Sequence, residues 1–127
     1  MPKRLVIDLD GTLTEGGTNY SELSPRVEVV EVLRRYKAMG FEIIIHTSRN
    51  MRTFSSSLGL ITAKTVPVII EWLNRNQIPF DELVVGKPWC GHEGFYVDDR
   101  AIRPSEFASM TLEQIHQLIR VSGPTDA

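Results

Sequence analysis

The sequence predicts an α/β domain built on a parallel sheet. Apolar runs typical of buried strands alternate with helical patterns, in the order strand, helix, strand, helix, strand, strand, helix. Acidic, hydroxyl and basic side chains follow these strands directly, at the sheet edge where parallel α/β proteins bind their ligands. The length of 127 residues is that of one domain, and we expect 1–127 to form it.

The first strand is expected over 5–8, where the apolar run shows too little alternation for a half-exposed strand. The polar, glycine-bearing stretch 14–24 indicates a loop. Ser24 and Pro25 have the residue types that favour the N-cap and the first position of a helix. The apolar face and the stop of this helix are expected at Val29, Leu33, Tyr36 and Gly40.

The second strand is expected over 41–45, which is rich in β-branched residues and ends at His46 and Thr47. The stretch 49–63 contains SSSLG and indicates a loop or an irregular short helix. A second helix is expected from Thr65 onward. The residues expected on its buried side are Val66, Ile69, Ile70 and Leu73, with Trp72 in the core.

Two further strands are expected over 83–85 and 95–97. The final helix is expected to begin at Thr111, because Gln114 three positions later completes a capping-box pattern. The core-facing residues of this helix are expected to be Leu112, Ile115 and Ile119.

Composition and charge exclude several functional classes. The hydrophobic content of 42% and charged content of 24% are ordinary for a globular protein, and a net charge of −2 gives no basic field for nucleic acid or anionic lipid. The single cysteine, Cys90, excludes an internal disulfide and suits a reducing compartment. The apolar run before Asp10 is too short for a signal-peptide core, and no stretch reaches the ~20 apolar residues of a membrane span. We therefore expect a cytoplasmic protein with neither nucleic acid nor membrane as partner.

The strand ends carry side chains suited to metal and phosphate chemistry. The groups at the ends of the four expected strands are, in order, Asp8 and Asp10; Thr47; Lys87; and Asp98 and Asp99. Carboxylates gathered at ~4 Å repel one another by roughly 1 to 4 kcal/mol per pair, which one lysine does not offset. Either some of the carboxyls are protonated or a divalent cation lies among them. Hard oxygen ligands without neighbouring imidazole or thiolate favour Mg²⁺.

The motif DLDGT at 8–12, followed in order by Thr47, Lys87 and the Asp98-Asp99 pair, resembles the four motifs of haloacid-dehalogenase-type (HAD) phosphohydrolases. The resemblance covers residues 4 to about 100. Within that superfamily, the stretches HTSRNMR and VGKPWCGHEGFYVDDRAIRPSEF are similar to small phosphatases of capsule polysaccharide biosynthesis. The resemblance implies a three-layer sandwich around a Rossmann-like parallel sheet.

The spacing between the motifs leaves no room for a cap domain, so the resemblance is to the capless group. Members of that group have open sites that take bulky substrates or are covered by a neighbouring subunit. We therefore expect a homo-oligomer, with the loop TEGGTNY as a candidate flap over the site.

The resemblance also implies a role for each motif residue. Asp8 would be the nucleophile that forms an aspartyl-phosphate, and Asp10 would protonate the leaving oxygen and then activate water. Thr47 and Lys87 would hold phosphoryl oxygens. The ligands of the implied Mg²⁺ would be Asp8, the Asp10 backbone carbonyl and Asp98, with Asp99 as an outer or alternate ligand.

The substrate implied by the closer resemblance is a phosphorylated small molecule, a sugar phosphate or related intermediate of surface polysaccharide synthesis. Candidate substrate-binding residues near the strand ends are Ser48, Arg49, Arg52, Trp89 and His92. Arg49 and Arg52 either bind a second anionic group of the substrate or lie in solvent. Successive side chains of a strand point to opposite faces of the sheet, so we expect His46 and Thr47 to lie on different faces. We interpret His46 as structural.

Two other functions use related chemistry. A phospho-receiver domain combines clustered aspartates, a Thr or Ser, a Lys and Mg²⁺ on a parallel sheet, but its acidic pair comes early, whereas here the D-x-D motif comes first and the acidic pair last. A phosphomutase shares the aspartyl-phosphate but usually needs a cap that excludes water. The sequence therefore favours a Mg²⁺-dependent phosphomonoester hydrolase.

Overall fold

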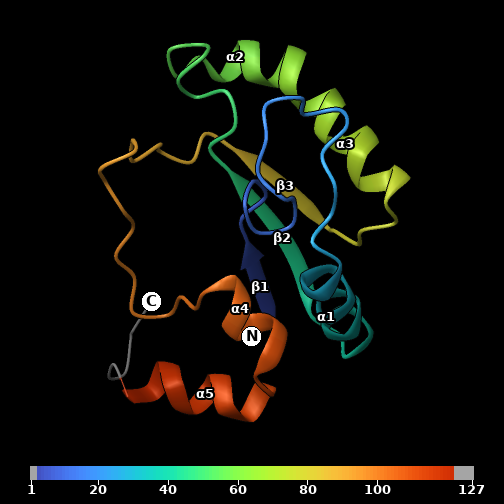
Figure 1. Ribbon diagram of the computed structural model, residues 1–127, viewed down its shortest axis with the longest axis vertical. Coiled ribbons are helices and arrows are strands. Elements are labelled where there is room, and N and C mark those ends of the chain that lie inside the picture. Colours follow the sequence, from blue (N-terminus) through green and yellow to red (C-terminus); the bar gives the residue numbers. More distant parts are fainter. Residues whose placement is uncertain (1–2, 122–127) are drawn as a thin grey trace. The chain divides into compact units, whose positions relative to one another are not determined.

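A computed structural model describes residues 3–121 and contains a three-stranded parallel sheet in the order β1-β2-β3 (Figure 1). The strands are β1 (Arg4–Ile7), β2 (Glu42–Thr47) and β3 (Glu82–Val85). Ile7 lies opposite Ile45, and Thr47 lies opposite Val85, so the carboxyl ends of all three strands meet at one edge of the sheet. The expected α/β class with a parallel sheet is confirmed, and the strands at 5–8, 41–45 and 83–85 are found within a residue or two of their expected bounds.

The chain divides into two compact units, one up to Trp89 and one from Cys90 onward. Besides the sheet, the first unit contains α1 (Val27–Ala38), α2 (Leu58–Leu60), the π-helix η1 (Ile61–Thr65) and α3 (Val66–Arg75). The second unit contains α4 (Pro104–Ser109) and α5 (Leu112–Val121). Within residues 3–121, every helix is too short or too polar to span a lipid bilayer.

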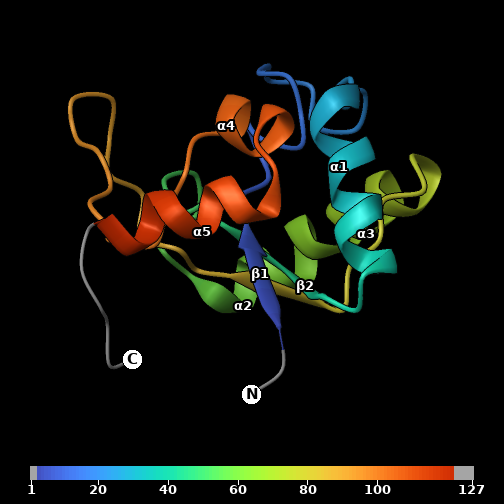
Figure 2. The ribbon, with the colours of Figure 1, turned by 90° about the horizontal axis from the view of Figure 1, so that it is seen from below.

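The core of the first unit lies on one face of its sheet. Helices α1 and α3 both lie on this side in Figures 1 and 2. Ile43 and Ile45 of β2 point to this face and are fully buried, whereas Val6 and Val84 on the other face are exposed. Besides Ile43 and Ile45, the largest fully buried side chains of this unit are Leu9, Leu13, Leu33, Ile61, Ile69, Trp72 and Leu73.

Helix α1 begins later than the sequence predicts. Its N-cap is Arg26 rather than Ser24, and no side chain caps it. The reason is a long-range pairing: the Arg26 N–H donates to the Leu13 carbonyl at 2.8 Å, and Thr14 bridges Pro25 in antiparallel fashion. These contacts hold the residues before Val27 in an extended conformation. The expected buried face at Val29, Leu33 and Tyr36 is confirmed, as is the stop at Gly40, whose φ is +95°.

The segment between β2 and α3 is irregular, as expected, and consists of turns followed by α2 and η1. In α3, Ile69 and Leu73 are buried as expected, but Ile70 is exposed. Trp72 occupies the core beside them, and its Nε1–H donates to the Leu23 carbonyl at 2.6 Å. The buried indole therefore anchors the loop that precedes α1.

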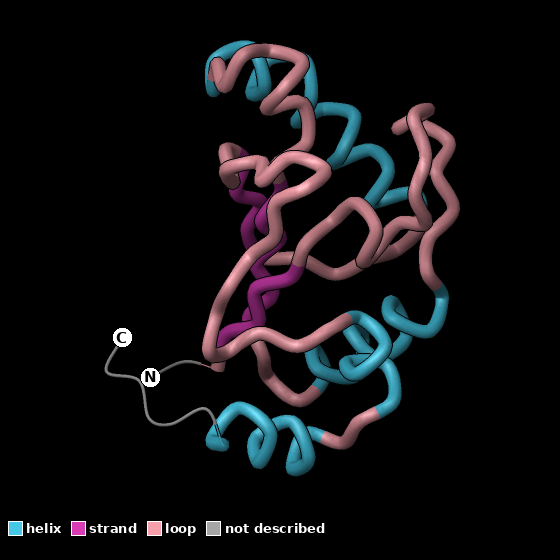
Figure 3. The backbone as a smooth tube through the Cα atoms, turned by 60° about the vertical axis from the view of Figure 1, so that its left-hand side comes forward, coloured by secondary structure: helices cyan, strands magenta, loops and turns pink. Residues whose placement is uncertain are grey.

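The expected strand over 95–97 is wrong. This segment belongs to no strand in the described part of the chain and is drawn as loop in Figure 3, and the side chains of Phe95 and Val97 are 79% and 88% exposed. A short apolar run becomes a strand only where a neighbouring backbone completes its hydrogen bonds. Sequence periodicity does not supply that partner.

Helix α4 was not expected, although its local signals are present. Pro104 stands at its first turn, and the Glu106 side chain accepts the Arg103 N–H at 2.8 Å. Helix α5 has the expected capping box, in which Thr111 and Gln114 exchange hydrogen bonds of 2.9 and 3.1 Å. Of its expected core residues, Ile115 is buried, and Leu112 and Ile119 are half-buried.

Candidate active site

The two aspartates of the DLDGT motif lie at the carboxyl end of β1, where the chain turns sharply. The N–H groups of Thr12, Leu13 and Thr14 all lie within hydrogen-bonding distance of the Leu9 carbonyl. Gly11 makes this turn possible with a φ of +81°, which L-residues with a side chain rarely adopt. Leu9 is fully buried beneath the turn, while the side chains of Asp8 and Asp10 remain about one-third exposed.

Asp8 is a partly desolvated carboxylate with the Lys87 ammonium beside it. Lys87 Nζ lies 3.6 Å from its Oδ1, and the Thr12 hydroxyl donates to its Oδ2 at 3.2 Å. Burial raises the pKa of the Asp8 carboxyl above its ordinary value, and the positive charge of Lys87 offsets part of this rise. A further cation at this carboxylate would favour its ionised, nucleophilic form.

Thr47 and Lys87 come together at the ends of β2 and β3. The Lys87 N–H donates to the Thr47 carbonyl at 3.2 Å, directly beyond the last paired residues of the two strands. Gly86, with a φ of +90°, turns the chain at this point. The Thr47 side chain is buried, and its hydroxyl oxygen accepts the Arg49 N–H at 3.0 Å.

His46 belongs to the electrostatic surroundings of Asp8. The register of β1 and β2 pairs Val6 with Ile44. Two residues further along each strand, Asp8 and His46 follow on the same face of the sheet. Burial lowers the pKa of the His46 imidazole, Lys87 lowers it further, and Asp8 acts in the opposite direction. The sequence alone indicates a structural role for His46, because its side chain points to the other face of the sheet from Thr47. The same alternation, applied across both strands, would have placed it beside Asp8.

Arg49 holds Asp10 through two hydrogen bonds. Its Nε and Nη2 donate to the two carboxylate oxygens of Asp10 at 3.0 and 2.7 Å. The Arg49 side chain is 1% exposed, and its guanidinium carbon lies 4.3 Å from the centre of the Tyr20 ring. The structure thus excludes the solvent alternative for Arg49, because the guanidinium is a buried partner of Asp10.

The remaining candidates lie in more open positions. Ser48 is half-buried, whereas Arg52 and Trp89 are exposed. Trp89 is the last residue of the first unit, and His92, also exposed, belongs to the second.

Asp98 and Asp99 are exposed residues of the second unit, and the Asp98 carboxylate accepts the Arg100 N–H at 2.8 Å. Within the first unit, the structure brings together Asp8, Asp10, Thr47, Lys87 and Arg49.

The oxygen donors of the first unit fit a Mg²⁺ ion with few protein ligands. Across residues 3–121, no group of three or more His, Cys, Asp or Glu side chains gathers to hold a metal. Mg²⁺ commonly uses only one or two carboxylates and takes its other ligands from water and substrate phosphate. A bound Mg²⁺ would find one carboxylate ligand in the partly desolvated Asp8 and a neutral oxygen in the Asp10 backbone carbonyl at the same turn. The Asp10 carboxylate itself is engaged by Arg49.

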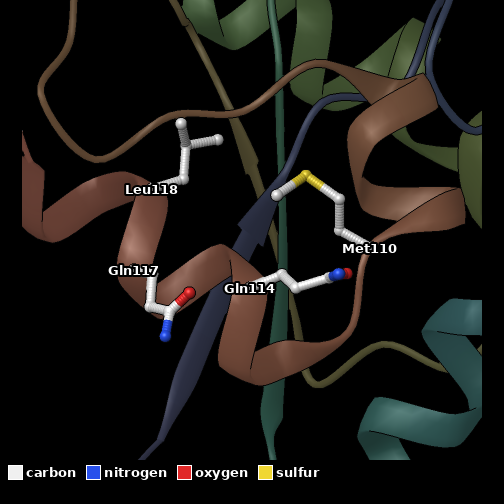
Figure 4. Close-up of a pocket in the computed structure, with 4 residues that line it drawn as sticks. All are labelled: Met110, Gln114, Gln117 and Leu118. Carbon is white, nitrogen blue, oxygen red and sulfur yellow. The ribbon is translucent and has the colours of Figure 1, made fainter.

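A pocket of about 400 Å³ in the second unit has a different character (Figure 4). Its lining residues are Met110, Gln114, Gln117 and Leu118. None of these side chains carries a charge or a nucleophile, so this pocket offers no group for phosphoryl transfer.

Comparison with known proteins identifies relatives by structure. No family model and no curated protein matches the chain. Two solved structures of the Pnkp1/Rnl/Hen1 complex, one of them described as an RNA repair complex, contain a chain that is 22% identical to this one, with TM-scores of 0.51 and 0.53. The match covers 72% and 87% of this chain but only 28% and 35% of those chains. At this identity the likeness concerns the fold alone.

A much stronger match is the crystal structure of an MCSG target from Vibrio cholerae. The two proteins are 58% identical, with a TM-score of 0.92, and the match covers 94% of this chain and 98% of that chain. The description of that protein states its source and no activity. The chain belongs to the same family as this Vibrio cholerae protein.

Proposed function

We propose that the protein is a Mg²⁺-dependent phosphomonoester hydrolase that acts through an aspartyl-phosphate on Asp8. The observation that carries this proposal is the pairing of Asp8 with Lys87 at 3.6 Å, at the edge of a parallel sheet where Asp10 and Thr47 also lie. A nucleophile, a proton-transfer group and a phosphate-binding cation are the parts that phosphoryl transfer requires.

The proposed reaction has two steps. In the first, an oxygen of Asp8 attacks phosphorus, the bond between phosphorus and the leaving oxygen breaks, and Asp10 gives that oxygen a proton. In the second, Asp10 takes a proton from a water molecule, whose oxygen attacks phosphorus. The bond between phosphorus and Asp8 then breaks, and inorganic phosphate leaves.

The other residues of the cluster bind the phosphoryl group and position the reacting side chains. The Lys87 ammonium binds phosphoryl oxygens and reduces the repulsion between the phosphate and the carboxylates. The buried Thr47 hydroxyl is a second contact for the phosphoryl group. In the substrate-free protein, Arg49 holds the Asp10 carboxylate through paired hydrogen bonds. When Asp10 carries the proton for the leaving oxygen, one of its two oxygens leaves this pairing and turns to the substrate, while the other stays bound to Arg49. A Mg²⁺ ion held by Asp8 and the Asp10 carbonyl would neutralise negative charge on the transferring phosphoryl group.

The HAD assignment, in its capless form, belongs to this proposal. It is supported by the order of the four motifs and by the position of three of them at neighbouring strand ends. That pattern also assigns Asp98 or Asp99 to the metal, whereas the cluster described above draws only on the first unit. A phosphorylated intermediate of surface polysaccharide synthesis as substrate, a cytoplasmic location and a homo-oligomeric state complete the proposal.

The decisive experiment is a phosphatase screen over phosphosugars and nucleotides, with and without Mg²⁺ after chelation. Asp8→Asn is the blank, and Asp81→Asn, a matched substitution far along the chain at the opposite end of β3, is the control. We expect turnover that requires Mg²⁺, persists in Asp81→Asn and disappears in a folded Asp8→Asn protein. Wild-type turnover in Asp8→Asn would show that Asp8 is not the nucleophile. Stoichiometric phosphorylation without release of phosphate would instead indicate a receiver-type module.

A further inference from the structure

A pocket with several polar lining residues lies beside Arg49 in the first unit. It has a volume of about 250 Å³, and among its lining residues are Tyr20, Ser21, Arg49, Asn50, Lys64 and Thr65. These residues come from the loop before α1, from the turn after β2 and from η1. One of them, Arg49, also holds Asp10, so the pocket adjoins the candidate active site through a single side chain.

The Arg49 guanidinium has one donor group left over. Its Nε and Nη2 are used by Asp10, and the Tyr20 ring covers one face. Its Nη1 is buried and has no hydrogen-bond acceptor within the described residues. A buried donor without an acceptor destabilises the protein, and the more so where the group is charged. A ligand oxygen at this atom would offset that destabilisation.

The charge of the pocket favours an anion. Lys64 is exposed on η1 and makes no ion pair with any side chain between residues 3 and 121. The Asn50 side-chain oxygen already accepts the Thr65 hydroxyl at 2.7 Å. The carboxylate nearest in sequence to the lining loop, Glu22, accepts the Asn19 amide at 2.9 Å and does not line the pocket. Among the described residues, Lys64 therefore remains as a positive charge without a counter-ion.

We propose that this pocket binds a second anionic group of the substrate. The substrate is then a phosphomonoester that also carries a carboxylate or a second phosphate, which pairs with Lys64 and with Nη1 of Arg49. This inference rests on the proposed function, because the ester phosphate is assigned to Asp8 and Lys87. It narrows the substrate class from phosphomonoesters in general to those with two acidic groups.

The pocket also connects substrate recognition to proton transfer. The guanidinium that contacts the second anionic group is the same one that orients Asp10. A substrate with the second group fixes Arg49 from both sides, whereas a substrate without it leaves Nη1 unsatisfied. The second group should therefore raise kcat as well as lower KM.

The test uses matched pairs of ligands. The carboxylate arm compares 6-phosphogluconate with glucitol 6-phosphate, and the phosphate arm compares fructose 1,6-bisphosphate with fructose 6-phosphate. Binding is measured calorimetrically on Asp8→Asn, which does not turn the ligands over, and kcat/KM is measured on the Asp8 enzyme. Each measurement is repeated with Lys64→Gln and with Lys3→Gln, a matched charge removal outside the pocket.

We expect the diacidic member of at least one pair to bind roughly tenfold more tightly, the value of one charged hydrogen bond. Lys64→Gln should remove most of this preference, and Lys3→Gln should leave it intact. Equal affinities within both pairs, or a preference that survives Lys64→Gln, would overturn the subsite. Selective binding of diacidic ligands without turnover would support the subsite and contradict the proposed hydrolase activity. Turnover without a preference for diacidic substrates would support the hydrolase activity and contradict the subsite.

Discussion

Arg49 donates to both carboxylate oxygens of Asp10, at 2.7 and 3.0 Å, from a side chain that is 1% exposed. The pair joins the turn after β1 to the end of β2, two segments separated by 39 residues of sequence. Asp10 is thus the more exposed member of a largely buried ion pair. Its orientation is set by a residue outside the DLDGT motif.

The first prediction concerns the energy of this pair. Arg49→Met removes the guanidinium and leaves a partly buried carboxylate without its partner, so we expect a loss of about 2–3 kcal/mol in the free energy of unfolding. Asp10→Asn should cost less, and the double variant should show a coupling energy of about 1–3 kcal/mol. Urea unfolding of the four proteins measures this cycle. Additive single effects would show that the hydrogen bonds contribute nothing to stability.

The second prediction concerns the proton carried by Asp10. In Asp10→Asn we expect turnover of alkyl phosphates, such as sugar phosphates, to fall on the order of 10²-fold or more, because the alkoxide leaving group needs a proton. Activated aryl phosphates need less protonation and should lose less. The comparison is made by steady-state kinetics on both substrate types. Equal losses would contradict the role of Asp10 as general acid.

The third prediction concerns Gly86, which precedes Lys87. Its φ of +90° is strained for any residue with a side chain, and an added Cβ would lie 2.7 Å from Leu58 Cδ2. The exposed Leu58 side chain can move away from the added Cβ, so backbone strain is the main cost of Gly86→Ala. We expect this strain to lower the free energy of unfolding by about 1–2 kcal/mol. Gly16→Ala is the control, because nothing lies within 4 Å of its added Cβ. Equal melting temperatures for the two variants would argue against the strain.

The fourth prediction concerns pH and Asp81. The Lys37 ammonium donates to both Asp81 oxygens at 2.8 Å, and the Ile43 N–H donates at 2.7 Å; these bonds lower the pKa of the Asp81 carboxyl below its ordinary 3.8. Because the pKa of Asp81 is lower in the folded than in the unfolded state, ionised Asp81 stabilises the fold at pH values above its unfolded-state pKa of 3.8. This stabilisation is lost as the pH falls from 3.8 through the folded-state pKa.

Asp81→Asn should therefore melt at a lower temperature than the wild type at pH 7, and the difference should shrink as the pH falls below about 3.8. Thermal melts across this range give the result. Lys37→Met should behave in the same way, since it removes the other partner. A difference that stayed constant down to the lowest pH would indicate that the charge on Asp81 is not what stabilises the fold.

The strands of the first unit were predictable because their signal is local. The run before Thr47 is apolar and β-branched, and such a run is buried in almost any parallel sheet. The start of α1 was not predictable from Ser24 and Pro25, because the pairing of Leu13 with Arg26 overrides their capping preference. The segment 95–97 fails for a related reason, since a strand requires a partner that periodicity does not reveal.

The residues of the candidate site also differ in how far the local sequence predicts their positions. The positions of Asp8, Thr47 and Lys87 follow from parallel strands whose carboxyl ends meet, so a motif after each strand was sufficient to group them. The partnership of Arg49 with Asp10 and Tyr20 depends on how two loops pack, and no spacing in the sequence encodes it.

The hydrogen bond from the Trp72 indole to the Leu23 carbonyl gives the protein an optical probe of its own loop. The same loop carries Tyr20, which lies against Arg49. The sequence contains two tryptophans, and Trp89 is 44% exposed whereas Trp72 is 1% exposed. In a Trp89→Phe protein, the emission wavelength therefore reports on a single buried indole and its bond to the loop, so that movement of this loop during substrate binding can be followed by fluorescence without an added label.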